Sequence, residues 1–255
     1  MTTTTTTPAD PWVLNGRKQR LVPDPATGEM RPYQRVSTFA RTLSDSQGLG
    51  PWLAWMALKG TQSQDGGRLM QQILHAEKTP RGLIDQLAEL GGSAEARERG
   101  SRRHQIVAMA LTGADLTGLP AEAATELQAI LDLIHGLGTV VAVEAATVCD
   151  EYQTAGSMDL AVRQPDGTVW IIDLKTGSRP PSGIESCLQL AAHARSCYWV
   201  DGQRGDWVSK SRPRLGIIHA PQNGGTPRLI EYDPDAAKRA ALLAVQVREL
   251  RKELK

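Results

Sequence analysis

Two aspartates and a lysine are spaced along the chain so that a folded hairpin could bring them together. Asp159 precedes the run Asp173-Leu-Lys175 by fourteen residues, and Pro165-Asp-Gly167 stands between them, flanked by apolar runs. A Pro-Asp-Gly turn in that setting predicts a β-hairpin. Because side chains alternate along a strand, Asp173 and Lys175 should point to one side, which Asp159 on the partner strand can share. The spacing therefore predicts two carboxylates and one ammonium group at one end of a hairpin.

Those three groups are suited to hydrolysing a phosphodiester with a divalent metal ion. Magnesium prefers carboxylate oxygens and keeps several waters, and the backbone carbonyl of Leu174 offers a further oxygen. Lys175 would orient or polarise the attacking water and offset negative charge in the transition state. Without a cation, two carboxylates about 4 Å apart repel by about 4 kcal/mol at an effective dielectric of about 20. The cluster therefore implies a bound cation.

The same residues also have a purely structural interpretation. Asp159 and Lys175 could form a cross-strand ion pair worth under about 1 kcal/mol. Asp173 is harder to explain in this way, because it follows the apolar run Trp170-Ile-Ile172 in an expected central strand. A carboxylate buried there is costly unless it is paired or bound to a metal. The position of Asp173 therefore favours the functional interpretation.

Two residues earlier in the chain could join this site. Glu144 lies in the preceding apolar run, fifteen residues before Asp159, and could either bind the metal or only support the site. His104 follows Gly100-Ser-Arg-Arg in an expected helix. By itself a helical histidine is more often exposed, but an imidazole can complete a magnesium or manganese shell, and manganese is the more tolerant of nitrogen. We therefore expect His104 to be a metal ligand.

Three further polar residues are candidates for contact with a nucleic acid. Gln189 lies four residues before His193, on the same face of an expected helix, and could contact DNA or pack between elements. Arg102 and Arg103 could be solvated or could contact phosphate.

Composition limits the class of protein. The chain has 255 residues, 40% hydrophobic and 22% charged, with a formal net charge of +1. No apolar run approaches the roughly 18 residues that span a bilayer, and the Thr-rich start lacks the regions of a signal peptide, which predicts a cytoplasmic protein. A nucleic-acid enzyme of near-zero net charge can still concentrate its basic residues in one groove.

Two common chemistries are disfavoured by missing motifs. The three cysteines, Cys149, Cys187 and Cys197, are widely spaced and form no Cys-x-x-Cys pair, which argues against a zinc site or a disulfide framework. The chain also has no Gly-x-x-x-x-Gly-Lys-Ser/Thr loop, which argues against an ATP-driven motor.

Periodicity predicts the elements that must position these residues. We expect helices over 67–77, 80–91, 93–111, 120–135, 182–200 and 235–254, and strands over 139–149, 157–163, 168–175, 215–220 and 228–232. A further short helix should begin near Ser37, and Ser182 and either Asp233 or Asp235 are expected N-caps. The fold class is α/β, a mixed central β-sheet flanked by helices, with a helical N-terminal lobe. The expected domains are a flexible arm at 1–32, a helical lobe at 33–138 and a catalytic core at 139–255.

One ordered set of residues resembles a known family. The set Gly100-x3-His104, Glu144, Gly156-x2-Asp159, Asp173-x-Lys175-Thr-Gly177 and Gln189 resembles the PD-(D/E)XK nuclease superfamily. Within it, the RecB-type branch, which includes phage recombination exonucleases, is the most similar. The resemblance covers about residues 95 to 200, and the segment from Arg35 also resembles the first helices of actinobacteriophage exonucleases.

The resemblance implies a restriction-endonuclease-like core and a role for each matched residue. Asp159 and Asp173 would be metal ligands, Lys175 the catalytic lysine and His104 an extra metal ligand. Gln189 would belong to a Gln-x-x-x-Tyr motif that holds DNA or the edge of the site, although this chain has His193 where the motif has tyrosine. Relatives with an iron–sulfur cluster carry four cysteines, so no such cluster is expected here.

These features together predict a Mg²⁺- or Mn²⁺-dependent deoxyribonuclease, an exonuclease of phage or bacterial recombination and repair, acting in the host cytoplasm if it is phage-encoded. The helical half would form an arch or clamp over the catalytic sheet. The alternatives are a catalytically silent DNA-binding scaffold of the same fold and an endonuclease. DNA is the expected partner, no membrane is involved, and a single-strand annealing protein is a further partner by family analogy alone.

Overall fold

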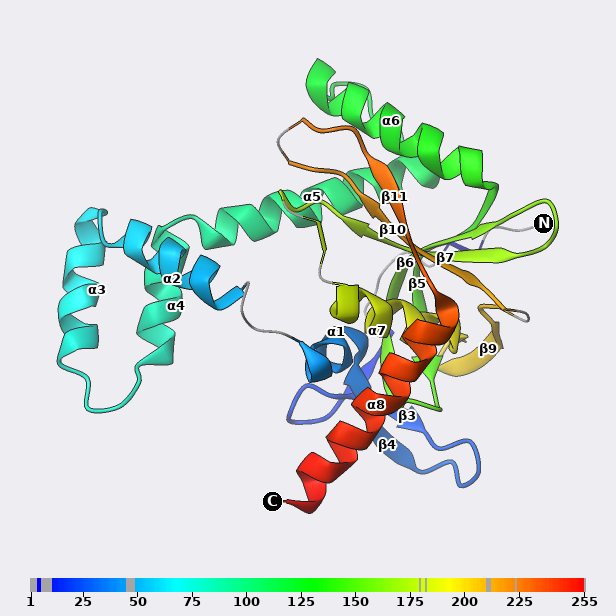
Figure 1. Ribbon diagram of the computed structural model, residues 1–255, viewed down its shortest axis with the longest axis horizontal. Helices are drawn as coiled ribbons and strands as arrows, with labels where there is room; N and C mark the ends of the chain where they lie inside the picture. Colours follow the sequence, from blue (N-terminus) through cyan, green and yellow to red (C-terminus); the bar gives the residue numbers. More distant parts are fainter. Residues whose placement is uncertain are drawn as a thin grey trace. The chain divides into compact units, whose positions relative to one another are not determined.

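The computed structural model describes residues 4–5, 11–44, 49–178, 180–181, 183–209, 212–222 and 224–254. The chain forms two compact units (Figure 1). One consists of Met1–Ser44 together with His104–Lys255, and the other of Asp45–Arg103. The larger unit, which we call the sheet unit, carries nearly all of the candidate site.

A mixed sheet forms the centre of the sheet unit. Its long middle strands are β5 (Thr139–Cys149), β6 (Thr154–Arg163), β7 (Val169–Lys175), β10 (Arg214–His219) and β11 (Arg228–Tyr232). They pair in the order β5-β6-β7-β10-β11, antiparallel except for the parallel pair β7–β10. The predicted hairpin is therefore β6–β7, and the strands predicted at 139–149 and 228–232 are confirmed.

Shorter strands extend this sheet. They are β1 (Thr4–Thr5), β2 (Val13–Leu14), β3 (Arg20–Pro23), β4 (Met30–Arg35), β8 (Cys197–Val200) and β9 (Gln203–Trp207). β8 pairs with β5, and β9 pairs with β8. At the other edge, β4 pairs in parallel with the start of β6, and β3 and then β2 pair beyond β4. Both ends of β6 thus have hydrogen-bonded neighbours.

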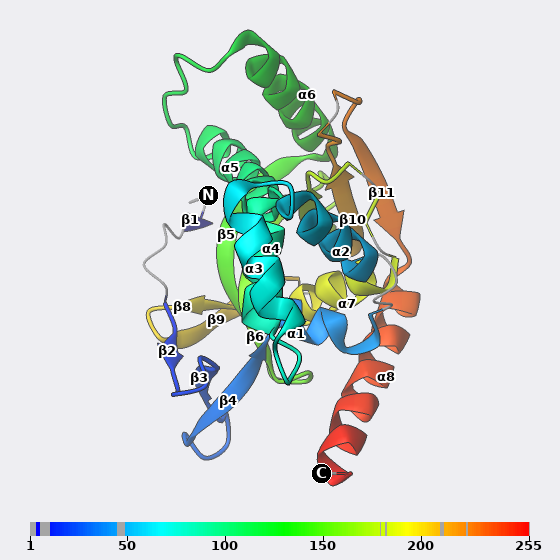
Figure 2. The ribbon, with the colours of Figure 1, turned by 90° about the vertical axis from the view of Figure 1, so that its left-hand side faces the viewer.

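Helices cover both faces of the sheet. One face is covered by α1 (Val36–Ala40), the 3-10 turn Arg41–Leu43, α7 (Gly183–Ala194) and α8 (Pro234–Glu253), and the other by the end of α5 (Ser93–Leu111) and by α6 (Ala121–Leu137). Figure 2 shows α6 and α8 well apart in this unit. Ile171 packs in the α7–α8 core and Ile172 in the α5–α6 core. Burial on both faces explains the unbroken apolar run at the start of β7. The predicted fold class, a mixed sheet flanked by helices, is confirmed.

The smaller unit is helical. It contains α2 (Leu49–Gly60), α3 (Gln64–Leu74), α4 (Arg81–Leu90) and the start of α5. Glycines allow α2 and α4 to pack closely, because a Cβ atom on Gly60 would lie 1.9 Å from the carbonyl oxygen of Leu87. A Cβ atom on Gly91 would lie 1.8 Å from the carbonyl oxygen of Met56. No side chain larger than hydrogen fits at either position.

The compact units are divided at different residues from the predicted domains. The arm predicted for 1–32, which could be ordered from Trp12 onward, contains strands between residues 11 and 32, in which Val22 is fully buried. Trp12 stacks on Trp199 with ring centroids 5.5 Å apart, which ties this segment to the sheet. The predicted lobe at 33–138 is split, since Phe39 of α1 stacks on Tyr152 and α6 packs on the sheet.

Several predicted boundaries change with the tertiary structure. The helix predicted over 182–200 is wrong beyond Ala194, because Cys197–Val200 forms strand β8 against Thr147 and Val148 of β5. Asp233 caps α8 as predicted, its carboxylate accepting a hydrogen bond from the backbone N–H of Ala236. α1 begins one residue before Ser37 without a side-chain cap, and Ser182 lies outside the described residues.

Over the part of the chain that the structure describes, every helix is too short or too polar to cross a lipid bilayer.

Candidate metal centre

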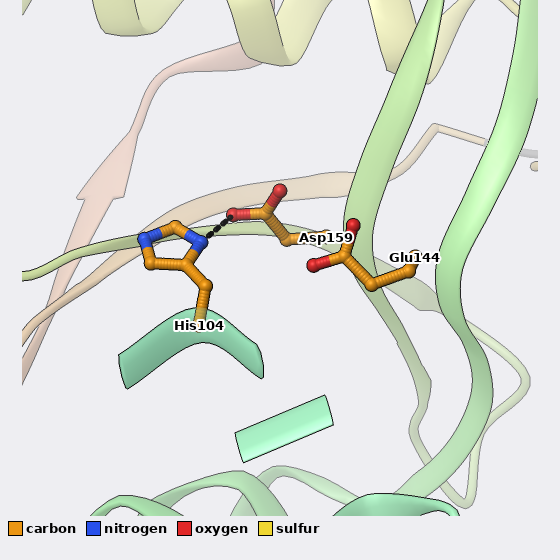
Figure 3. A group of neighbouring side chains, drawn as sticks. All are labelled: His104, Glu144 and Asp159. Carbon is orange, nitrogen blue, oxygen red and sulfur yellow. Dashed lines mark ion pairs between the residues drawn. The ribbon is translucent and has the colours of Figure 1, made fainter. Parts of the chain in front are cut away.

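Three side chains from three elements of the sheet unit converge beside the sheet. His104 lies on α5, Glu144 on β5 and Asp159 on β6, and one ligand atom from each lies within 4.8 Å of the others. The Nδ1 atom of His104 is 3.4 Å from Oδ2 of Asp159. Figure 3 shows the two carboxylates on adjacent strands with the imidazole facing Asp159. The structure therefore brings together three of the residues predicted to form the site.

A local break in strand alternation points Glu144 and Asp159 toward α5. They face each other across the β5–β6 ladder, between the pairs Val143–Leu160 and Ala145–Met158. Glu144 has a left-handed backbone with φ of 48°, which is uncommon for a residue other than glycine. Val143 and Leu160 pack in the α5–α6 core whereas Ala145 and Met158 pack in the α7–α8 core, so both strands change face at this level. Backbone strain of this kind is typical of functional sites.

The charges of this group suit a divalent cation. Burial, followed by the charge of Asp159, raises the pKa of Glu144. Burial lowers the pKa of His104, although Asp159 partly offsets the effect, so the imidazole is neutral at neutral pH. Metals bind the neutral imidazole and the ionised carboxylate, and like charges directly opposite on paired strands are destabilising without one. One nitrogen and two carboxylates therefore fit a metal such as Mn²⁺ or Mg²⁺.

Asp173 and Lys175 form a second group on the other side of β7. The Nζ atom of Lys175 is 2.7 Å from Oδ2 of Asp173, and both side chains point toward α7, as their alternation predicts. Gln189 of α7 joins them, because its amide donates a short hydrogen bond to Oδ1 of Asp173 and its Oε1 accepts from Lys175 at 3.3 Å. Gln189 therefore contacts both residues.

This arrangement keeps the lysine charged. Burial raises the pKa of Asp173, and the charge of Asp159 raises it further, whereas Lys175 opposes the change. Burial alone would lower the pKa of Lys175, but the carboxylates of Asp173 and Asp159 outweigh it, and its pKa rises. Lys175 is thus an ammonium group at neutral pH, held beside a carboxylate that is 3% exposed.

The two groups are joined through the backbone of Leu174. Its N–H donates a hydrogen bond of 2.9 Å to Oδ2 of Asp159, the same oxygen that approaches His104. The expectation that Asp159, Asp173 and Lys175 share one side differs from the structure, since Asp159 faces α5 and the other two face α7. The physical reason is the break at Glu144 and Asp159, which simple alternation does not include. Within the described residues, Asp173 lies outside the three-residue ligand group.

The two arginines predicted to contact phosphate belong to the helical unit and directly precede His104 on α5. Arg102 forms an ion pair of 2.9 Å with Glu98, one turn earlier on the same helix. Contact of Arg102 and Arg103 with phosphate stays a prediction.

His193 takes a structural position where the nuclease motif has tyrosine. Its ring is fully buried on α7, and Nδ1 lies 2.9 Å from the hydroxyl oxygen of Thr147 on β5. A Cβ atom on Gly156 would lie only 2.7 Å from Cγ2 of Val36, whereas its distance from Cε1 of His193, 3.5 Å, would be an ordinary contact. His193 therefore joins α7 to the sheet.

Buried, neutral His193 predicts a loss of stability in acid. Burial lowers its pKa to about 4, so below the unfolded value of about 6.5 the unfolded chain binds a proton that the folded chain does not. Its contribution is complete above about pH 6.5 and is lost as the pH falls toward about 4. Between about pH 7 and pH 5, wild type should lose about 2 kcal/mol of unfolding free energy relative to His193→Gln. Urea denaturation in chelator measures this difference, and parallel pH profiles of the two proteins would contradict it.

The fold and donor set define a class: an α/β enzyme core with a candidate divalent-metal site on adjacent strands. A family model described as the PD-(D/E)XK nuclease superfamily matches residues 57–254, most of the chain. The chain therefore belongs to the PD-(D/E)XK nuclease superfamily, whose nucleases use divalent metal ions.

Other comparisons add little. A search of curated proteins finds no match. The crystal structure of SSO0001 aligns with 80% of this chain and 88% of its own, at 15% identity and a TM-score of 0.26.

Proposed function

We propose that this protein is a Mg²⁺- or Mn²⁺-dependent DNA exonuclease of the RecB-type branch that acts in phage or bacterial recombination and repair. The observation that supports it most is the His104, Glu144 and Asp159 group, one backbone hydrogen bond from the Asp173, Lys175 and Gln189 group. A catalytically silent scaffold has no chemical need for both groups. An endonuclease needs the same catalytic groups, and only an assay on DNA without ends distinguishes it from an exonuclease.

The proposed ligands are the side chains of His104, Asp159 and Asp173 and the carbonyl oxygen of Leu174, with Glu144 supporting them. When bound, the metal supplies an acidified water and neutralises charge on the phosphate. Asp159 also fixes the β7 strand through the N–H of Leu174 at 2.9 Å, which holds that backbone beside the ligands.

Lys175 is the proposed catalytic cation. Its ammonium group is kept protonated by Asp173, and so it donates hydrogen bonds to the attacking water and offsets the growing negative charge on the phosphate. Gln189 is a positioning residue, because its amide contacts both Asp173 and Lys175 and limits their rotation. The helical unit is proposed to serve as an arch or clamp over the substrate, and an annealing protein is the proposed partner.

The deciding experiment measures release of acid-soluble nucleotides from end-labelled linear duplex DNA, with Mg²⁺, with Mn²⁺ and with chelator. Closed circular duplex and linear single strands run in parallel. Metal-dependent release from linear DNA alone is the expected result. Cutting of the circle would establish an endonuclease instead, and DNA binding without cleavage under either metal would favour the silent scaffold.

His104 should matter more for manganese than for magnesium. Replacing His104 by alanine removes the nitrogen donor, which Mn²⁺ accepts more readily than Mg²⁺ does. We expect Mn²⁺ affinity to fall at least about tenfold and Mg²⁺ affinity by less than about threefold. Isothermal titration of each ion measures both values. His135→Ala, at an exposed histidine of α6, is the matched control, and unchanged affinity for both ions would exclude His104 as a ligand.

A further inference from the structure

A cavity of the sheet unit, apart from the candidate metal centre, is lined by many basic residues. This cavity of about 660 Å³ is lined by segments far apart in the sequence: the turn after β2, strand β4 with α1, the turn after β5 and the end of α8. Six of its lining residues are basic, and we call it the basic cavity: Arg17, Lys18, Arg35, Arg248, Arg251 and Lys252. Among the described residues, no acidic side chain lines it.

Ordinary structural roles explain only part of this charge. Arg248 donates a hydrogen bond to the carbonyl oxygen of Tyr152, and Lys252 pairs with Glu249 at 2.9 Å. Basic residues near the end of α8 also complement the helix dipole. Those roles leave the basic residues of the other segments unexplained.

Arg17 and Lys18 reach the cavity from the turn after β2 and Arg35 from the end of β4, and none of the three forms an ion pair with any described residue. The whole chain has 29 basic and 28 acidic residues, so an excess of this size is local. Like charges brought together in a concave site raise the local concentration of an anion. The distribution of charge therefore indicates a negatively charged ligand.

The backbone around the basic cavity is also unusual. Lys18 and Gln153 have left-handed conformations, with φ of 57° and 47°, and the described residues contain only four such non-glycine positions. One of the other two is Glu144 in the candidate metal centre. The Oε1 atom of Gln34, which also lines the cavity, is buried without a hydrogen-bond partner among the described residues. Strain and unsatisfied polar atoms are retained mostly where a site binds something.

The pairing of β4 with β6 sets the spacing between the two sites. Gln34 and Arg35 pair with Thr154 and Ala155 at the start of β6, the strand that carries Asp159 five residues after Thr154. Five residues of strand span about 17 Å at about 3.3 Å each. That length is about five base steps of DNA at about 3.4 Å each. Along β6, the residues that pair with Gln34 and Arg35 therefore lie about five base steps from Asp159, which is a lower limit for a strand that contacts both sites.

We propose that the basic cavity binds backbone phosphates of the DNA substrate, at least about five nucleotides from the position of cleavage. Guanidinium groups suit this role because they bind phosphate oxygens in pairs. The proposal extends the nuclease function proposed above by giving the substrate a second contact outside the metal centre. It also predicts a minimum length below which a substrate gains nothing from the cavity.

The test compares two triple variants with the same change of charge. The cavity variant is Arg17→Ala, Arg35→Ala and Arg251→Ala, and the control variant is Arg163→Ala, Arg228→Ala and Arg239→Ala. All six side chains are exposed in the sheet unit, and the control residues do not line the cavity. Binding of a labelled duplex of about 30 base pairs is measured by fluorescence anisotropy in chelator over a range of salt concentrations.

The cavity variant should bind at least about tenfold more weakly, and the slope of log affinity against log salt should decrease in magnitude by about 2 to 3. The control variant should change by less than about twofold. A single Arg251→Glu variant repeats the test should the triple variant fail to fold.

Unchanged DNA affinity and salt slope in the cavity variant would overturn the proposal. The proposal would also be overturned if the cavity variant lost binding to phosphatidylserine vesicles but kept its binding to DNA. A wild-type protein that did not bind DNA in chelator would overturn it as well. Because DNA binding is measured without metal, the result of the binding test does not depend on the result of the nuclease assay. A protein that binds DNA through the cavity but never cleaves it would refute the proposed nuclease function and leave the cavity as a DNA site.

Discussion

Replacing Asp159 by asparagine should abolish metal binding and reduce DNA cleavage at least about 1000-fold, because loss of a metal ligand removes several kcal/mol of transition-state stabilisation. The amide keeps the size of the side chain and can still accept the hydrogen bond from Leu174. It removes the negative charge that stands opposite Glu144 and beside His104. Titration with Mn²⁺ and the nuclease assay measure the two losses.

The same substitution should not destabilise the metal-free protein. Burial, followed by the charge of Asp159, raises the pKa of Glu144, because the two carboxylates stand opposite each other on paired strands. Removing one charge relieves this repulsion, so Asp159→Asn should be as stable as wild type in chelator, or more stable. Asp201→Asn is the matched control, since Asp201 is an exposed aspartate with φ of 50°, a conformation that asparagine tolerates. A less stable variant with normal metal binding would give Asp159 a structural role only.

Replacing Lys175 by alanine should lower the rate of cleavage at least about 100-fold, the scale of one group that stabilises transition-state charge. DNA binding should be almost unchanged, because the lysine acts on the reacting phosphate. Asp173 would then be buried without its cation, and its already raised pKa would rise further, which removes a charge instead of leaving it unpaired. Gln189 would still donate to Asp173. The fold should therefore survive the change.

Single-turnover kinetics with protein in excess separate the chemical step of this variant from binding. Lys238→Ala, at an exposed lysine of α8, controls for the loss of one positive charge. Near-normal single-turnover cleavage by Lys175→Ala would remove Lys175 from the mechanism. Normal rates at saturation with weak binding would instead make it a substrate-binding residue.

Local sequence patterns determined the elements that carry the site. The Pro165-Asp-Gly167 turn between apolar runs predicts β6 and β7, and the helix predicted over 93–111 matches α5. Turn type and hydrophobic periodicity depend on neighbours a few residues away, so one sequence is enough to detect them. The same locality explains why Asp173 and Lys175 were correctly expected on one side of their strand.

The tertiary structure alone decided the short edge strands and the direction of Asp159. β2, β3 and β8 are too short to show a hydrophobic period in the sequence. The stacked rings of Trp12 and Trp199 are far apart in the sequence. Asp159 approaches His104 of α5 whereas Asp173 contacts Gln189 of α7, and β5 and β6 change face at the level where Glu144 has a left-handed backbone. A strand's own sequence does not contain that information, since the conformation is held by the surrounding packing.

The basic cavity shows most clearly which features the sequence determines and which only the tertiary structure decides. Its residues run from Arg17 to Lys252, and each segment by itself reads as an ordinary charged turn or helix end. The sequence determined that the chain carries almost no net charge, and with it that any excess must be local. Only the pairing of β4 with β6 and the packing of α8 bring these charges together, because a field depends on where charges lie in space and not on their order along the chain.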